Sequence, residues 1–427
     1  MPPLAAPRTR SAGAFPVVIA AIAVTMFASA APSPLYPVYQ QLWGFSAATL
    51  TIVFAAYVGA LLVSLLTMGS LSDHVGRRSV TAASLLLLAV AMILFAATGS
   101  VAGLITARVV QGLATGTAIG TLSAAVVDLQ PSRRVGSLVN TAAMTGGLGL
   151  GIAVSALLVQ YAPEPRRLVF AAVAVALVVV VAAFLALVPE TSPRKGFASP
   201  AHAARSLAPR VSVPREVRSA FAAAIPALTA TWALGGLNLS LGSSILGREL
   251  GISNHAAGGA LLSGFFLAAA AAAPLATTRR PVRLPASYLL LAVGLAFQLA
   301  GSVTTSAPAY VAGLVITGIG FSTAFSGVLA SLAHAPASER SRLFAAVYIV
   351  SYVAFSVPAV IGGLTTDSYG LGRTTDGYTV FVLLMVALAA ALHVSRRQPA
   401  PAAIPSQGEP PARREPAPES CGAGKAA

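Results

Sequence analysis

Long apolar segments with almost no charge recur along the whole chain, and they constrain its fold more than any other feature. A helix that crosses a membrane needs about 20 mostly apolar residues. Only 9% of the residues are charged, against about 25% in soluble domains. The segments are rich in Ala, Leu and Val and lack the two-residue alternation of a transmembrane barrel. We therefore predict an all-α integral membrane protein with twelve transmembrane helices, at residues 15–36, 48–68, 79–98, 101–127, 136–159, 168–188, 219–241, 256–276, 284–305, 308–332, 343–364 and 378–395.

The basic residues are distributed unevenly between the segments that connect these spans. If the spans cross the membrane in turn, 22 of the 27 Lys and Arg residues fall on the side of the two chain ends and four on the other side. By the positive-inside rule, both termini are predicted to be cytoplasmic, in a plasma (cell inner) membrane. This placement explains the net charge of +15 without a nucleic-acid partner.

The first apolar segment also resembles a secretory signal peptide. Arg8 and Arg10 precede it, and Ala28-Ser29-Ala30 has the small residues of a cleavage site. Cleavage would leave eleven spans. The paired organisation of the chain needs the first helix, so we expect this segment to be retained.

A basic, Pro-containing stretch at residues 189–218 divides the spans into two sets of six. We predict an N-terminal six-helix half at 1–188, a cytoplasmic linker at 189–218, a C-terminal six-helix half at 219–396 and a disordered cytoplasmic tail at 397–427. A shift of 206 residues aligns the spans of the halves and superposes Gly112 on Gly318 and Arg77 on Arg283. Six-helix repeats are typical of transporters, whose substrate site lies between the halves near the membrane midplane.

A glycine-containing basic loop follows the second predicted span. Its pattern is Gly-x-Leu-x-Asp-x-x-Gly-Arg-Arg, with Gly69, Asp73, Gly76, Arg77 and Arg78 at the fixed positions. This loop resembles the signature loop of the major facilitator superfamily (MFS), in sequence and in its place after the second span. The resemblance implies the MFS fold and a gating role for the loop. The alternative is a plain basic turn that only fixes the topology.

A second match to the superfamily lies in the fourth span, where Arg108, Gln111 and Gly112 form Arg-x-x-Gln-Gly. Arg108 is the only charge well inside a predicted span, and a buried charge in a membrane helix favours a functional role. We take these residues as candidates for coupling or substrate binding. In some relatives this arginine is tied to proton coupling, so the resemblance implies protons as a coupling ion. Alternatively, Arg108 braces neighbouring helices.

Charged residues stand at equivalent places after the fourth and tenth spans. Asp128, Arg133 and Arg134 occupy the first of these loops, and Glu339 and Arg340 occupy the second. We interpret them as a cytoplasmic gate closed by ion pairs between the halves. A solvated loop is an equal alternative.

Polar and aromatic residues within the spans are candidates for lining the substrate cavity: Tyr36, Asn140, Trp232, Asn238, Phe325, Tyr348 and Tyr352. Each has packing between helices as its alternative role. Together they predict a neutral, partly aromatic cavity, which favours an apolar, weakly polar or cationic substrate over a polyanion.

Some features depart from the drug–proton antiporters of the superfamily. Ile152 follows the glycines of the fifth span where those antiporters often have Pro, and the first span has no carboxylate. Arg279 stands where the repeat predicts the acidic residue of a second signature loop. A membrane-embedded carboxylate that could carry a proton is therefore missing from the predicted spans.

From these features and the resemblance, we predict a secondary transporter that works by alternating access. Resemblance to the drug-efflux branches implies efflux of a small hydrophobic or drug-like compound. The alternatives are uptake of a neutral metabolite or sugar, and a structural or signalling membrane protein that transports nothing. We expect a monomer in the lipid bilayer, no enzyme activity, no cofactor and no metal. The chain has no phosphate-binding loop, so direct drive by ATP is not expected.

Overall fold

The computed structural model describes residues 13–68, 71–192, 196, 199, 208, 211–277, 282–332 and 339–395. In this part of the chain, 12 helices are long and apolar enough to cross a membrane, as the sequence predicts. The helices before the linker are α1 (Ala14–Ala30), α2 (Tyr36–Trp43), α3 (Ala47–Met68), α4 (Leu71–Val75), α5 (Arg77–Ala97), α6 (Val101–Leu129), α7 (Arg133–Tyr161) and α8 (Pro165–Leu187). After the linker come α10 (Arg218–Ser240), α11 (Gly242–Ser244), α12 (His255–Thr277), α13 (Leu284–Val303), α14 (Ala307–Ser331), α15 (Arg340–Tyr369) and α16 (Leu371–Ser395). The short elements are η1 (Ser33–Leu35), η2 (Arg215–Val217) and η3 (Ile245–Glu249).

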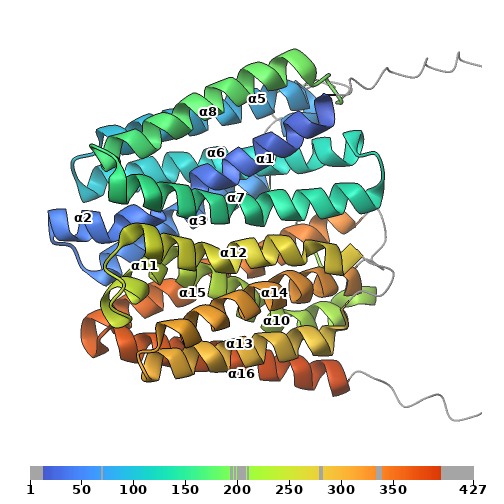
Figure 1. Ribbon diagram of the computed structural model, residues 1–427. Coiled ribbons are helices and arrows are strands. Elements are labelled where there is room, and N and C mark those ends of the chain that lie inside the picture. Colours follow the sequence, from blue (N-terminus) through green and yellow to red (C-terminus); the bar gives the residue numbers. More distant parts are fainter. Residues whose placement is uncertain are drawn as a thin grey trace, which may run out of the picture.

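The long helices run side by side, and the described chain starts and ends at the same end of the bundle (Figure 1). We call the end that holds Ala14 and Ser395 the terminal face. The end that holds Trp43 and Gly370 is the opposite face. The predicted linker lies partly outside the described residues and the predicted tail wholly so. The boundaries of linker and tail therefore stay predictions.

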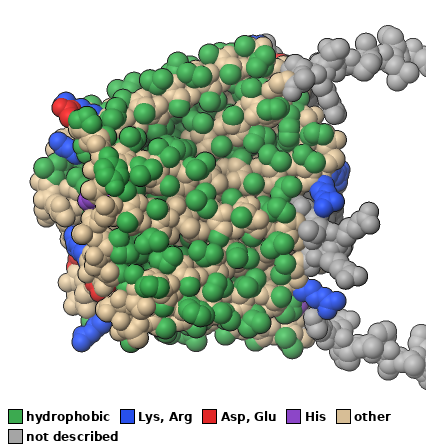
Figure 2. All heavy atoms as spheres, viewed as in Figure 1, with side chains coloured by type: hydrophobic (Ala, Val, Ile, Leu, Met, Phe, Trp, Pro, Cys, Tyr) green, Lys and Arg blue, Asp and Glu red, His purple; other side chains and the backbone are tan. Residues whose placement is uncertain are grey.

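The flank between the two faces is apolar. Hydrophobic side chains cover it in Figure 2, whereas Lys, Arg, Asp and Glu gather at the two ends. Large apolar side chains are well exposed there, including Val175 (64%) and Leu289 (64%). Such an apolar surface is stable in contact with lipid tails. Helices are stable there because their backbone hydrogen bonds are satisfied internally.

The two sets of six helices pack in the same order. In the first set, α1 packs on α7 and α8, α3 packs on α6, and α5 packs on α6 and α8. In the second set, α10 packs on α15 and α16, α12 packs on α14, and α13 packs on α14 and α16. Contacts of α7 with α12 and of α3 with α15 join the halves. This repeated packing order is the pseudo-symmetry that the sequence predicts.

Glycines allow the closest of these helix contacts, at positions that the repeat relates. A Cβ atom on Gly112 of α6 would clash with the carbonyl oxygen of Tyr57 on α3 and lie 2.8 Å from Cβ of Ala60. On Gly318 of α14, a Cβ atom would likewise clash with the carbonyl oxygen of Phe265 on α12. Small residues let helix backbones approach in this way.

The predicted end of the first span is wrong. The first span does not end at 36, because the chain bends through η1 and continues as α2 to Trp43. Pro32, Pro34 and Pro37 lie in the bend and lack the amide hydrogens that a straight helix uses.

The last two spans are longer than predicted. Only Gly370, with φ of 84°, separates α15 from α16. Helix α16 therefore includes Asp376 in its second turn, partly buried. Arg108 is not the only charged residue within a spanning helix, and this part of the prediction is corrected.

Candidate functional site

The signature loop forms a short helix and a turn at the terminal face. Gly69 lies outside the described residues, as does the side chain of Asp73, whose backbone is in α4. Gly76 has φ of 111°, a conformation that favours glycine, and α5 begins at the next residue.

A carboxylate that the sequence analysis did not single out caps α5. Oε1 of Glu190 accepts a hydrogen bond from the Arg77 amide at 2.8 Å, and Oε2 accepts one from the Arg78 amide at 3.3 Å. A negative charge at a helix N-terminus is stabilising. Glu190 thus connects the start of the linker to the end of the signature loop. The signal for it was an acidic residue at the start of the basic linker.

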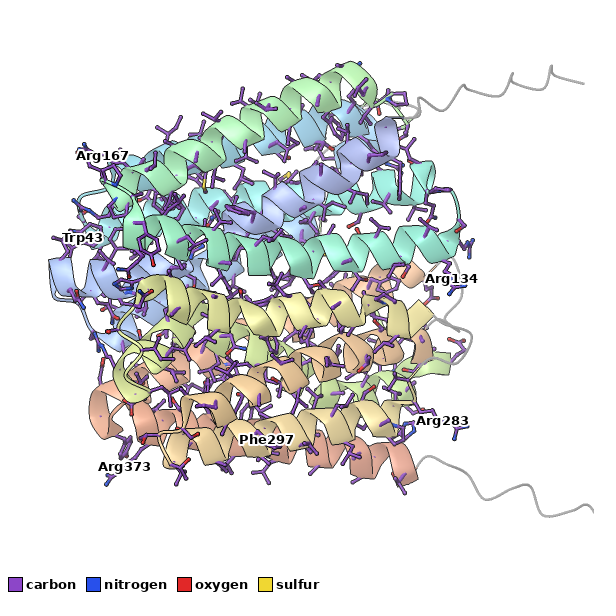
Figure 3. All side chains as sticks on the ribbon, viewed as in Figure 1. Trp43, Arg134, Arg167, Arg283, Phe297 and Arg373 are labelled. Carbon is purple, nitrogen blue, oxygen red and sulfur yellow. The ribbon has the colours of Figure 1, made fainter. Side chains whose placement is uncertain are left out.

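Arg77 also pairs with Asp128, which joins α5 to α6 within the first half. Arg133 and Arg134 are exposed at the terminal face, where Figure 3 shows Arg134. Glu339 is partly buried, and the side chain of Arg340 lies outside the described residues. Among the described residues no ion pair crosses between the halves here. A gate made of such pairs stays a prediction.

Arg108 is buried within the first half, with 1% of its surface exposed. Its guanidinium donates to the carbonyl oxygen of Ser29 at 3.2 Å, to the side-chain oxygen of Gln111 and to the hydroxyl of Tyr36. Gln111 in turn donates to the carbonyl oxygen of Ala28 at 2.8 Å. The sequence motif thus brings Arg108 and Gln111 together, and Tyr36 contacts Arg108 from the bend after α1.

Three aromatic rings surround the same guanidinium. Its carbon atom lies 5.3 Å from the ring centroid of Tyr36, 5.2 Å from that of Tyr57 and 5.6 Å from that of Phe95. Cation–π contacts of this kind stabilise a desolvated cation. These partners of Arg108 are all neutral, and they come from helices α1, α2, α3, α5 and α6. This arrangement braces the half and keeps one positive charge in its interior.

A cluster of aromatic rings lies where the halves meet. The ring of Trp232 on α10 has its centroid 5.6 Å from that of Phe325 on α14, and 5.1 Å and 5.7 Å from those of Tyr352 and Phe355 on α15. Phe54 on α3 of the other half reaches Phe355, with 5.1 Å between centroids. The second half therefore supplies most of this cluster, and the first half contributes Phe54.

One predicted cavity residue, Tyr348, and one unpredicted residue, Phe321, extend the aromatic cluster. Tyr348 lies 6.3 Å from Tyr352, and Phe321 lies 6.4 Å from Trp232, between ring centroids. Tyr348, Trp232 and Phe321 are partly exposed, whereas Tyr352 is 8% exposed. Sequence reasoning missed Phe54, Phe321 and Phe355. Phe321 and Phe355 each lie one helical turn from a residue that it named.

Buried amides form the polar part of the predicted cavity set. Asn238 on α10 is 1% exposed, and neither amide atom has a hydrogen-bond partner among the described residues. Asn140 on α7 is partly buried and lies 3.6 Å from the sulfur of Met144. Unpaired polar groups in an apolar interior are unfavourable, which marks them as places where a ligand or water can bind.

At the opposite face, side chains of each half hold the other half by hydrogen bonds. The carboxylate of Asp367, near the end of α15, accepts from the amides of Ala47 and Ala48 at the start of α3, at 3.1 Å and 3.3 Å. The hydroxyl of Ser33 donates to the carbonyl oxygen of Leu239 at 2.8 Å.

A further bond at this face links α7 and α12: the amide of His255 donates to the side-chain oxygen of Gln160 at 2.8 Å. The hydrogen bonds between described residues of the two halves all lie at the opposite face. The halves are therefore latched together at that face.

Twelve membrane helices in two similar halves, with a buried cation on one side of the interface and an aromatic cluster across it, define a helical membrane transporter. The sequence matches the family model described as Major Facilitator Superfamily over residues 18–273. The chain belongs to this superfamily and is a secondary transporter, not an enzyme. Comparison with curated protein sequences gives no match.

Solved structures share the fold at low sequence identity. The chain is similar to a bacterial homologue of the human lysosomal transporter Spinster in an inward-facing and occupied conformation, with a TM-score of 0.73, 13% identity, and coverage of 93% of this chain and 100% of the other. It is also similar to a POT family transporter in complex with a thioalcohol-conjugated peptide, with a TM-score of 0.71, 14% identity, and coverage of 90% and 96%. The human organic anion transporter MFSD10 gives a TM-score of 0.65, 17% identity, and coverage of 90% and 100%.

Proposed function

We propose that this secondary transporter exports a small hydrophobic or drug-like compound, which binds at the aromatic cluster between the halves. The observation that carries the proposal is the convergence of Trp232, Phe325, Tyr352 and Phe355 on Phe54 of the other half. A group bound there touches both halves, and alternating access requires that both halves respond to the substrate.

The chemistry of the cluster favours an apolar or cationic ligand. Aromatic rings offer large apolar surfaces and attract cations through their π-faces. Arg108, the buried charge of the first half, is already surrounded by neutral acceptors and aromatic rings. A polyanion would find no described side chain with a free positive charge among the cluster residues.

We place the terminal face in the cytoplasm of a cell that holds the protein in its plasma membrane. The excess of basic residues on that side supports this orientation. The latched opposite face then faces outwards, and the structure corresponds to a state closed to the outside. The similarity to an inward-facing transporter agrees with this reading.

We keep the gating role of the signature loop as a proposal, now with Glu190 as its partner. The bonds of Glu190 to the amides of Arg77 and Arg78, and the pair of Arg77 with Asp128, tie α5, α6 and the linker together at the terminal face. For the protein to open to the outside, the two halves must move relative to each other at the terminal face. Because of these contacts, the signature loop and the start of the linker would move together with the first half.

A neutral metabolite such as a sugar is the second candidate, because one observation favours it. Asn238 and Ser351 are buried, at 1% and 0% exposed, and their side-chain polar atoms lack hydrogen-bond partners among the described residues. Hydroxyl groups of a substrate would satisfy such groups. Uptake would then replace export.

Transport assays in inverted and right-side-out vesicles separate these candidates. A panel of hydrophobic cations, neutral aromatic compounds and sugars is offered to vesicles with the protein and without it. Export predicts protein-dependent accumulation of a hydrophobic compound in inverted vesicles. Trp232→Ala should abolish this accumulation, whereas Trp43→Phe, a change in the other tryptophan, should not. Accumulation of a sugar alone in right-side-out vesicles would overturn the export proposal in favour of the second candidate.

A further inference from the structure

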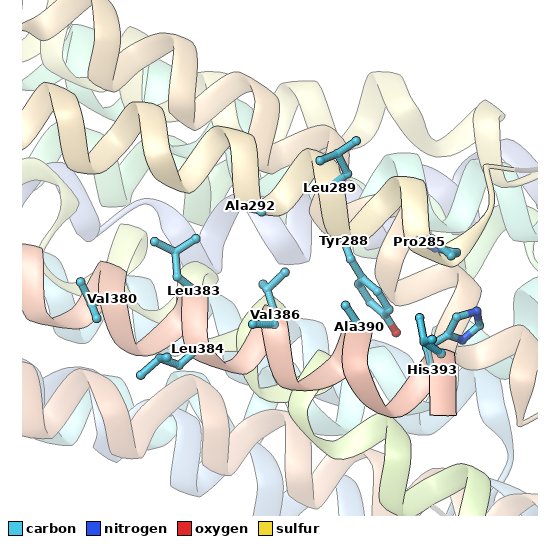
Figure 4. Close-up of a pocket in the computed structure, with 12 residues that line it drawn as sticks. Pro285, Tyr288, Leu289, Ala292, Val380, Leu383, Leu384, Val386, Ala390 and His393 are labelled. Carbon is cyan, nitrogen blue, oxygen red and sulfur yellow. The ribbon is translucent and has the colours of Figure 1, made fainter. Parts of the chain in front are cut away.

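A groove on the membrane-facing side of the second half has no part in the transport path proposed above. It is a cavity of about 510 Å³ between α13 and α16. Pro285, Leu289 and Ala292 line it from α13, and Val380, Leu384 and Val394 line it from α16 (Figure 4). Leu289, Leu384 and Val394 are 64%, 60% and 64% exposed, so the groove opens to the surroundings of the bundle.

The groove changes character along its length. Its walls are apolar from Val380 onwards, and Tyr288 and His393 lie at its terminal-face end (Figure 4). The rings of these two residues meet edge to face, with 6.3 Å between centroids. Both residues also line a second cavity of about 260 Å³ on their inner side, against α10 and α14. At its polar end, the groove is therefore bordered by additional empty space.

The length of the groove along the helices is close to the thickness of one leaflet of a bilayer. From Val380 to His393, α16 rises about 20 Å at ~1.5 Å per residue. The hydrocarbon core of a bilayer is about 30 Å thick, so one leaflet spans about half of it. A groove that starts at the terminal face and ends near mid-membrane has the length of one acyl chain with part of the headgroup region.

The mouth of the groove carries a positive charge. Arg283 is the residue before α13, two positions from Pro285, and its side chain is exposed at the terminal face (Figure 3). Neither α13 nor the part of α16 from Gly377 to Ser395 contains an Asp or Glu that would neutralise it. Basic pockets between membrane helices on this side of a protein attract anionic lipid headgroups.

We propose that this groove is a binding site for an anionic phospholipid. One acyl chain lies between α13 and α16, and the phosphate lies at the terminal-face end beside Arg283 and His393. The hydrocarbon chain explains the apolar walls, and the phosphate explains why the basic and polar groups occur at one end only. The site is independent of the substrate proposed above.

Native mass spectrometry of the full chain, released from nanodiscs that contain equal amounts of phosphatidylglycerol and phosphatidylcholine, tests the proposal. The wild type should retain phosphatidylglycerol in preference to phosphatidylcholine. Arg283→Gln should lower this preference about fivefold, the effect of one basic residue at a membrane surface. Arg373→Gln, which changes an exposed arginine near the other end of α16 (Figure 3), should leave it unchanged.

A second variant tests the acyl-chain part of the site. Ala292→Trp fills the groove and should remove the retained lipid of either headgroup. Ala182→Trp, at an exposed alanine of α8, serves as its control. Each variant is compared at equal abundance and melting temperature. The proposal is overturned by equal retention of the two lipids, by retention that Ala292→Trp leaves intact, by displacement with inorganic phosphate alone, or by a second copy of the chain found in place of lipid.

Discussion

Replacing Asp367 with alanine should shift the transporter towards a state open at the opposite face. The carboxylate of Asp367 accepts two amide hydrogen bonds from the start of α3, across the interface between the halves. It therefore acts as an N-terminal cap supplied by the other half. Loss of a cap costs about 1 kcal/mol. Asp367 is exposed, so screening by water keeps its effect from exceeding this value. Because the bonds exist only while this face is closed, the closed-to-open ratio should fall about fivefold.

Distances between spin labels at the opposite face measure this ratio. Labels at Tyr161 in the first half and Val303 in the second half, both more than half exposed at 71% and 67%, report on separation of the halves. Cys421 is first replaced by Ser, because it is the one native cysteine. Asp367→Ala should raise the fraction of long distances.

A cap within one half provides the control for Asp367→Ala. Ser100 caps α6 by accepting from the Gly103 amide at 3.2 Å, and both residues belong to the first half. Ser100→Ala should lower the melting temperature without changing the distance distribution. An unchanged distribution in Asp367→Ala, or an equal shift in Ser100→Ala, would refute the assignment of Asp367 as a latch between the halves.

Three further variants test the first half. Arg108→Gln should abolish transport per folded molecule, and Arg108→Lys should impair it strongly because the ammonium lacks the planar donor fork; normal transport by the surviving protein would leave only a bracing role. Gly112→Ala should destabilise the fold by about 1–3 kcal/mol through overpacking, whereas Gly120→Ala, whose Cβ would lie 3.6 Å from Leu65, should not lower the melting temperature. Glu190→Gln should slow transport by weakening the cap on α5, and unchanged turnover at equal abundance would reduce this contact to a packing role.

The number and approximate limits of the spans could be predicted because membrane insertion depends on local hydropathy. The predicted span limits were wrong where features other than hydropathy set the ends of the helices. The bend after α1 comes from three prolines, and the extension of α16 to include Asp376 is compatible with a helix end near the polar face of the bilayer.

The site could be predicted only in part. Arg108 and Gln111 carry a local motif, and their mutual contact follows from their spacing on one helix. The contact of Phe54 with Phe355 depends on how two helices from different halves are rotated, and no local pattern records this rotation. The cap of Glu190 on α5 likewise joins residues that lie 113 positions apart.

Fluorescence of Trp232 tests most directly whether the aromatic cluster is the substrate site. The chain has two tryptophans, so Trp43→Phe leaves Trp232 as the only reporter. A compound that the protein transports should quench or shift this fluorescence saturably, with a midpoint equal to that of its transport. Tyr352→Ala should move both midpoints together. A transported compound that leaves the emission of Trp232 unchanged at saturating concentration would contradict the account.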